Sequence, residues 1–139
     1  MAKEEELTRY MTLIEQYKEQ MSSLEMQSSY VQSAISDYTK AKMTLENLSK
    51  SSKGDEILLP IGGSTYIHAN AKDPSKVLFD IGAGLVTEKN LDDAIKKIDE
   101  RIEDLQKTME KMSTMMQQLQ NEATDISMKA QGLMSMGGQ

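Results

Sequence analysis

The residues of this chain that could take part in chemistry are few and scattered. His68 is the only histidine and cysteine is absent, so the chain has no thiolate nucleophile, disulfide or thiolate metal site. His68 lies in an apolar, strand-like stretch with no second histidine and no obvious acid beside it, which favours a surface position over a catalytic base. We therefore expect no enzyme activity, no metal and no cofactor.

Two glycine-rich stretches deserve comparison with nucleotide-binding loops. Gly62-Gly63 lacks the lysine and the spacing of a P-loop, and Gly82-Ala83-Gly84 lacks the third glycine and the following helix of a dinucleotide loop. Tight turns explain both better, because glycine reaches positive φ without a steric cost. ATP binding is not expected.

Methionine is the unusual residue, with twelve in 139 positions. Met109, Met112 and Met116 have the spacing of a helical core. Others fall outside that spacing, namely Met11, Met26, Met115, Met128, Met134 and Met136. Thioether side chains outside a core can repack against many apolar surfaces. These methionines are therefore consistent with a binding surface and with an ordinary solvent-exposed surface.

Two heptad patterns must position these side chains. Apolar residues follow heptad spacing from Leu91 to Leu133 without exception, and from Leu7 to Leu45 with Ser28 and Lys42 as exceptions. They predict an N-terminal coiled-coil helix over 3–49 and a C-terminal one over 90–136. Antiparallel pairing, in which paired numbers sum to about 140, would place Ser28 opposite Met112.

The intervening residues 55–89 have β character. Apolar strands around the two glycine-rich turns predict two hairpins, and Pro60, without an amide donor, places its strand at an edge or a bulge. Two such hairpins are marginal alone and expose strand edges, so they should join other subunits. The expected assembly interface comprises Ile57, Leu59, Ile61, Tyr66, Ile67, Val77, Phe79 and Ile81.

Composition limits the partners and the location. The net charge of −6 and a pI near 4.8 argue against binding nucleic acid or anionic membranes. Neither a signal peptide nor a stretch of about 20 apolar residues is present, so we expect a cytoplasmic protein. The predicted fold is a single α+β, mainly α subunit: an antiparallel two-helix coiled coil with two central hairpins.

The central segment resembles that of the α-type subunit of archaeal prefoldin. The resemblance rests on Leu58-Leu59-Pro60-Ile61-Gly62-Gly63, Tyr66-Ile67, Asp73-Pro74-Ser75-Lys76-Val77-Leu78, Ile81-Gly82-Ala83-Gly84 and Glu88-Lys89 between two heptad arms. Two hairpins match α-type subunits, because β-type subunits have one. The resemblance implies an ATP-independent chaperone in which two α and four β subunits join their hairpins into a β-barrel platform.

The same resemblance implies that coiled-coil tips hold unfolded proteins and deliver them to a group II chaperonin. Carried over by position, the client-binding tip would comprise Leu7, Tyr10, Met11, Ile14, Ile126, Met128, Leu133, Met134 and Met136. The methionine density is not part of the family pattern and could mark a specialised client range. The alternative is a structural coiled-coil spacer or a filament-forming, prefoldin-like subunit without client transfer.

Overall fold

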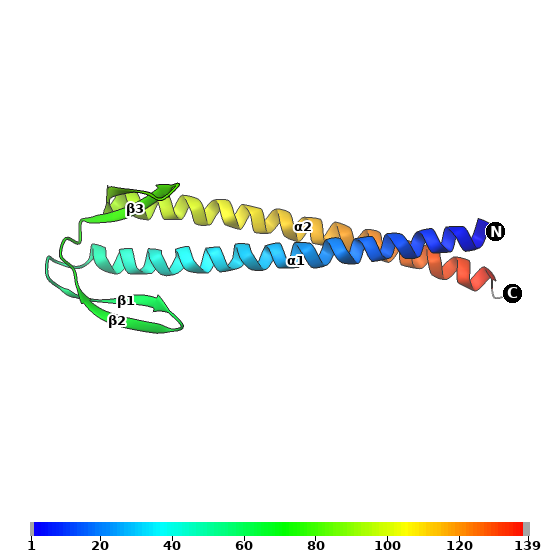
Figure 1. Cartoon of the computed structure of the whole chain (residues 1–139), viewed down its shortest axis with the longest axis horizontal. Helices are drawn as coiled ribbons and strands as arrows, with labels where there is room; N and C mark the ends of the chain where they lie inside the picture. Colours follow the sequence, from blue (N-terminus) through cyan, green and yellow to red (C-terminus); the bar gives the residue numbers. More distant parts are fainter. Residues whose placement is uncertain (1, 138–139) are drawn as a thin grey trace. The chain divides into compact units, whose positions relative to one another are not determined.

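The structure is a computed structural model that describes residues 2–137. The chain has a long helix at each end and four strands between them in sequence. The order is α1 (Ala2–Ser49), β1 (Glu56–Gly62), β2 (Thr65–Asn70), β3 (Lys76–Gly82), β4 (Leu85–Asn90) and α2 (Leu91–Gly137) (Figure 1). This confirms the predicted α+β class with two long helices and two hairpins. α1 begins one residue before the predicted start, and α2 follows β4 without an intervening loop.

The chain folds as two compact units. The terminal unit holds the residues up to Gln32 and from Lys107 onwards, and the central unit holds Ser33–Gln106 with both hairpins. The two helices pass through both units, so each unit contains a segment of α1 and a segment of α2.

In the terminal unit the two helix segments pair along the predicted heptad seam. Every seam position there is buried or half-buried, with Leu24 5% and Ala130 7% exposed. Ser28, a polar exception in the seam, lies against Met112 with 3.4 Å between its Oγ and the Met112 Sδ. This contact confirms the predicted pairing of Ser28 with Met112.

In the central unit the second polar exception also finds a partner on the opposite helix. Lys42 Nζ lies 2.7 Å from Asp99 Oδ1, and the two residue numbers again sum to about 140. The hydrogen bond between Lys42 and Asp99, together with the negative charge of Asp99, raises the pKa of Lys42 above the ordinary lysine value. A charged residue at one seam position is a common way to specify the register of a coiled coil.

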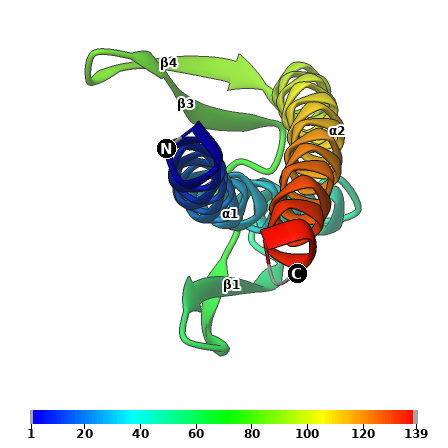
Figure 2. The ribbon, with the colours of Figure 1, turned by 90° about the vertical axis from the view of Figure 1, so that its right-hand side faces the viewer.

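The two hairpins share one backbone plan. Positions in β1–β2 recur 20 residues later in β3–β4, so that Leu59 pairs with Ile67 as Phe79 pairs with Thr87. Each hairpin has a bulge just before its turn, between Pro60 and Gly62 or between Asp80 and Gly82. The hairpins form separate two-stranded sheets that flank the helix pair of the central unit (Figures 1 and 2).

Both turns have two residues with positive φ. The values are 58° at Gly63 and 58° at Ser64 in the first hairpin, and 52° at Ala83 and 74° at Gly84 in the second. Paired positive φ angles characterise the type I′ turn, whose twist matches that of the adjoining strands. The glycines thus serve hairpin turns, as the sequence predicts.

The core of the central unit contains residues of the second hairpin. Phe79, Ala94 and Ile98 form its buried cluster, and Phe79 is only 9% exposed. Partly buried side chains surround this cluster, namely Tyr38, Ala41, Leu45, Val77 and Ile102. Both helices and β3 therefore contribute to one hydrophobic core.

Candidate binding and assembly surfaces

Alternation along the strands separates two faces of the second hairpin. Val77 is half-buried and Phe79 is buried, whereas Leu78 is 76% exposed and Val86, on the paired strand, is 58% exposed. Successive side chains in a strand point to opposite faces, which explains this division. One face packs on the helices and the other is exposed.

The residues expected at the assembly interface therefore differ in exposure. Ile61, Tyr66, Ile67 and Ile81 are exposed, whereas Ile57, Leu59 and Val77 are half-buried. Phe79 lies in the core of the central unit instead of at a free surface, because its position in β3 faces the helices. Its contribution to assembly would consequently be indirect.

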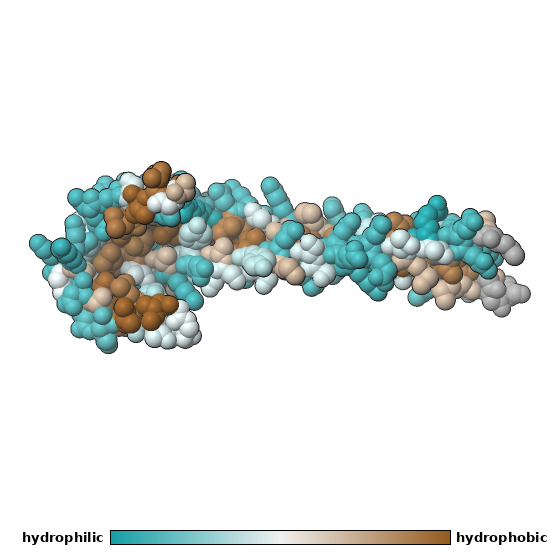
Figure 3. Space-filling view, in the orientation of Figure 1, coloured by the Kyte–Doolittle hydropathy of each residue, from teal (hydrophilic) through white to brown (hydrophobic). Residues whose placement is uncertain are grey.

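Four further apolar side chains on the hairpins are exposed, although the sequence analysis does not predict them as interface residues. They are Leu58, Leu78, Leu85 and Val86, each more than half exposed. The period-two pattern that separates Leu78 from Val77 and Phe79 was the available signal. Figure 3 shows apolar residues gathered over both hairpins, while polar residues dominate the visible surface of the terminal helices.

A groove runs between the two hairpins within the central unit. Apolar side chains line most of it, including Leu59, Ile61, Val77 and Phe79 from the strands and Ala41 and Leu45 from α1. Its charged side chains are Asp37, Lys40, Asp80 and Arg101.

His68 does have an acid beside it, contrary to expectation. Its Nδ1 lies 2.5 Å from Glu56 Oε1, and both side chains are mostly exposed. Since Leu58 pairs with His68 and Glu56 with Asn70, the two side chains are diagonal neighbours on one face of the hairpin. The pair is a solvent-exposed contact on a strand surface.

No cluster of three or more His, Cys, Asp or Glu side chains suitable for a metal occurs within residues 2–137.

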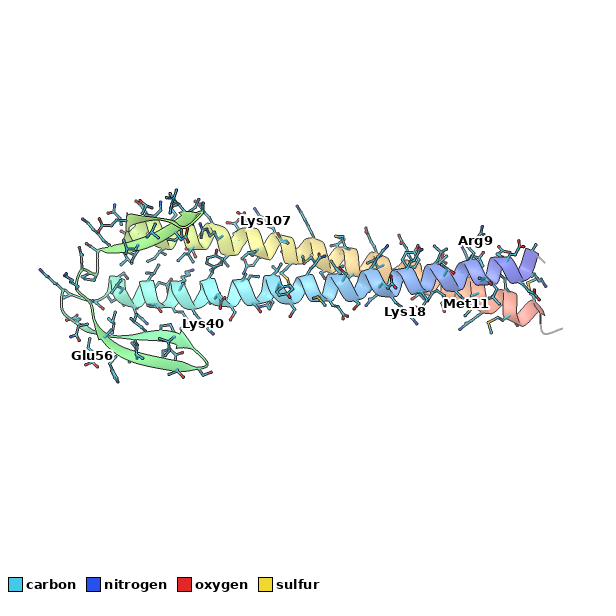
Figure 4. All side chains as sticks on the ribbon, in the orientation of Figure 1. Arg9, Met11, Lys18, Lys40, Glu56 and Lys107 are labelled. Atoms are coloured by element: carbon cyan, nitrogen blue, oxygen red, sulfur yellow. The ribbon has the colours of Figure 1, made fainter. Side chains whose placement is uncertain are left out.

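The expected client-binding residues form two classes in the terminal unit. Leu7, Tyr10, Ile14, Ile126 and Leu133 are half-buried at seam positions. Met11, Met128, Met134 and Met136 are between 59% and 65% exposed. Arg9 and Met11, labelled in Figure 4, are exposed and flank the half-buried Tyr10 in the sequence. An apolar seam with exposed thioethers beside it is thus present near both chain ends.

Polar contacts hold one aromatic side chain of this group. Tyr10 Oη donates a hydrogen bond of 3.0 Å to Glu6 Oε1, and the Arg9 guanidinium lies 5.9 Å from the centre of the Tyr10 ring. Such partly exposed contacts are individually weak. Neither helix, over the described residues, has an apolar stretch long enough to cross a membrane.

Comparison with known proteins places these features in a family context. The family model described as prefoldin subunit matches residues 17–135. The α subunit of prefoldin from Methanococcoides burtonii is 35% identical over 97 residues, covering 70% of each chain. That from Methanococcus maripaludis strain S2 is 35% identical over 106 residues, covering 76% of this chain and 72% of its own.

The fold is also similar to that of a solved structure. The chain resembles a subunit in the cryo-EM structure of filamentous prefoldin from Methanocaldococcus jannaschii, with a TM-score of 0.67 and 19% identity. The match covers 83% of this chain and 95% of the other. At that identity the likeness supports the arrangement of helices and hairpins and nothing finer.

Proposed function

Because the chain belongs to the prefoldin family as an α-type subunit, we propose that it is part of a cytoplasmic, ATP-independent holdase. In this proposal two copies join four β-type subunits through the hairpins. The ends of the terminal unit bind unfolded proteins and deliver them to a group II chaperonin. Delivery to a chaperonin rests on the family resemblance alone.

The observation that carries client capture is the exposed methionine group beside the apolar seam. Met11, Met128, Met134 and Met136 present flexible, polarizable side chains that fit irregular apolar surfaces. Burying one large apolar side chain contributes about 1.5–3 kcal/mol before ordering costs, so a few such contacts give only weak binding. Several subunits acting together would raise the avidity without a tight site.

The hairpins support the assembly part of the proposal. Two-stranded sheets are marginally stable alone, and here both carry exposed apolar side chains and open edges. Partner strands would cover these edges and bury Leu78 and Val86. The glycines serve type I′ turns, which agrees with a function that needs no nucleotide.

Aggregation of a chemically unfolded protein, measured by light scattering, tests client capture. The hetero-oligomer with an archaeal β-type subunit should suppress aggregation equally with and without ATP. A variant with Met11, Met128, Met134 and Met136 replaced by Gln should need several times more chaperone, because the amide loses apolar contact. Met26→Gln with Met43→Gln is the matched control, since both side chains are similarly exposed and lie outside the proposed tip.

Three results would contradict the proposal. Equal protection by the tip variant would place client binding elsewhere, and a reproducible need for ATP would remove the holdase mechanism. Assembly without protection of any unfolded protein would favour the structural spacer. Electron microscopy of the same samples separates discrete hetero-oligomers from filaments.

A further inference from the structure

We propose that Arg101 is a positioning residue that holds the β3–β4 hairpin in the orientation from which it joins other subunits. The proposal rests on the assembly function proposed above. The Arg101 guanidinium carbon lies 4.7 Å from the centre of the Phe79 ring and 5.7 Å from that of the Tyr38 ring. Arg101 Nη1 also donates a hydrogen bond of 3.3 Å to Tyr38 Oη. One side chain of α2 thus contacts both β3 and α1.

The chemistry of this contact favours arginine specifically. A planar guanidinium can lie over aromatic faces while its N–H groups donate in its own plane. A lysine ammonium is a compact, strongly hydrated charge that cannot stack in this way. Arg101 is half-buried in the groove between the hairpins, so the contact is partly shielded from water.

The Phe79 ring has a second cation near it. Lys89 Nζ lies 5.9 Å from the ring centre and comes from β4, the strand paired with β3. The two cations belong to different elements, one to the hairpin and one to α2. Phe79 consequently connects the hairpin to the helix pair through an oriented contact in addition to apolar burial.

The hairpin is attached to the helices at its base and at Phe79 of β3, and Arg101 adds an oriented contact to the second attachment. At the base β4 continues directly into α2, and the Leu91 amide donates a 2.9 Å hydrogen bond to the Ser75 carbonyl. A hairpin held at one end can swing about that end. A second attachment point along β3, at Phe79, fixes its direction and with it the exposed apolar face that carries Leu78.

The first hairpin provides an internal comparison. Its position equivalent to Phe79 is Leu59, which has no aromatic ring and cannot make a cation–π contact. Loss of the Arg101 side chain should therefore affect β3–β4 and leave β1–β2 nearly unchanged.

The test compares Arg101→Met, Arg101→Lys and Tyr38→Phe in the full chain. Lys97→Met is the matched control, because it removes a cation from the same stretch of α2, and Lys97 Nζ lies 3.9 Å from the exposed Glu100 Oε2. Amide hydrogen exchange resolves each hairpin separately, and far-ultraviolet circular dichroism reports the helices. Native mass spectrometry with an archaeal β-type subunit gives the concentration for half-maximal assembly.

Arg101→Met should accelerate exchange in β3–β4 and raise the half-assembly concentration about tenfold, with unchanged helicity. Arg101→Lys and Tyr38→Phe should have smaller effects in the same direction, and Lys97→Met none. Unchanged exchange in β3–β4, or equal acceleration in both hairpins, would overturn the positioning role. Wild-type protein that does not assemble would instead contradict the proposed function, while the exchange comparison would still decide on Arg101.

Discussion

The two hairpins have the same strand lengths, bulges and turns, yet they relate differently to the helices. In the second hairpin Phe79 enters the hydrophobic core, whereas Leu59 at the equivalent position of the first is only half-buried. Exposed apolar residues occur on both, such as Tyr66 on the first and Val86 on the second. The two hairpins thus share a backbone plan, and they differ in the side chain that each directs toward the helices at this position.

Pro60 and Asp80, the residues before the two bulges, show a second difference. Asp80 Oδ1 accepts a 2.8 Å hydrogen bond from the Gly82 amide, which satisfies a donor at the bulge. Pro60 has no side-chain acceptor and no amide donor of its own. A strand with proline offers a poorer edge to another chain, so the two copies also differ as templates for strand addition.

The largest expected effect comes from shortening the anchoring side chain. Phe79→Ala should lower the free energy of unfolding of the central unit by about 3 kcal/mol, because it removes a buried ring and leaves a cavity. Leu59→Ala should cost clearly less, since Leu59 is only partly buried. Urea denaturation of both variants measures the difference. Equal losses would mean that the first hairpin is attached as firmly as the second.

An intermediate effect is expected at the bulge of the second hairpin. Asp80→Ala removes the acceptor of the Gly82 amide and should destabilise β3–β4 by about 1 kcal/mol. Hydrogen exchange should accelerate about fivefold in that hairpin and stay constant in the first. Asp80→Asn retains a carbonyl acceptor and serves as the control. If both variants exchange alike, the side-chain hydrogen bond does not stabilise the bulge.

The smallest effect concerns the turn at the base of the second hairpin. The hydroxyl and amide of Ser75 donate to Asp73 Oδ1 at 2.6 and 3.0 Å, and these hydrogen bonds hold the pKa of Asp73 below its ordinary value of 3.8. A lowered folded-state pKa contributes stability above the unfolded-state value, and this stability disappears as the pH falls through the folded-state value.

Wild-type protein should therefore be more stable than Asp73→Asn at neutral pH, and the difference should vanish under strongly acidic conditions. Thermal unfolding of both proteins between neutral pH and pH ~2 measures it. Because Asp73 is fully exposed, we expect a small difference. A difference that persists in acid would show that the turn gains nothing from the ionised carboxylate.

Sequence alone determined the features that depend on local periodicity. Heptad spacing identified the seam from Leu7 to Leu45 and from Leu91 to Leu133, because a helical stripe must be buried whatever its partner is. Antiparallel pairing of the two heptad patterns, with paired residue numbers that sum to about 140, predicted the register that the Ser28–Met112 contact confirms. Glycine at positions of positive φ located both hairpin turns. The client-binding residues remain a prediction, although their division into seam and exposed positions follows from the same periodicity.

Only the tertiary structure decided which face of each hairpin packs against the helices. Strand alternation separates Phe79 from Leu78, but it does not say which of the two faces the core. The contact of His68 with Glu56 required the strand register, and that of Arg101 with Phe79 and Tyr38 required three elements to converge. Such contacts join residues that are far apart in sequence. A local sequence period cannot predict them, because they form only when the chain folds.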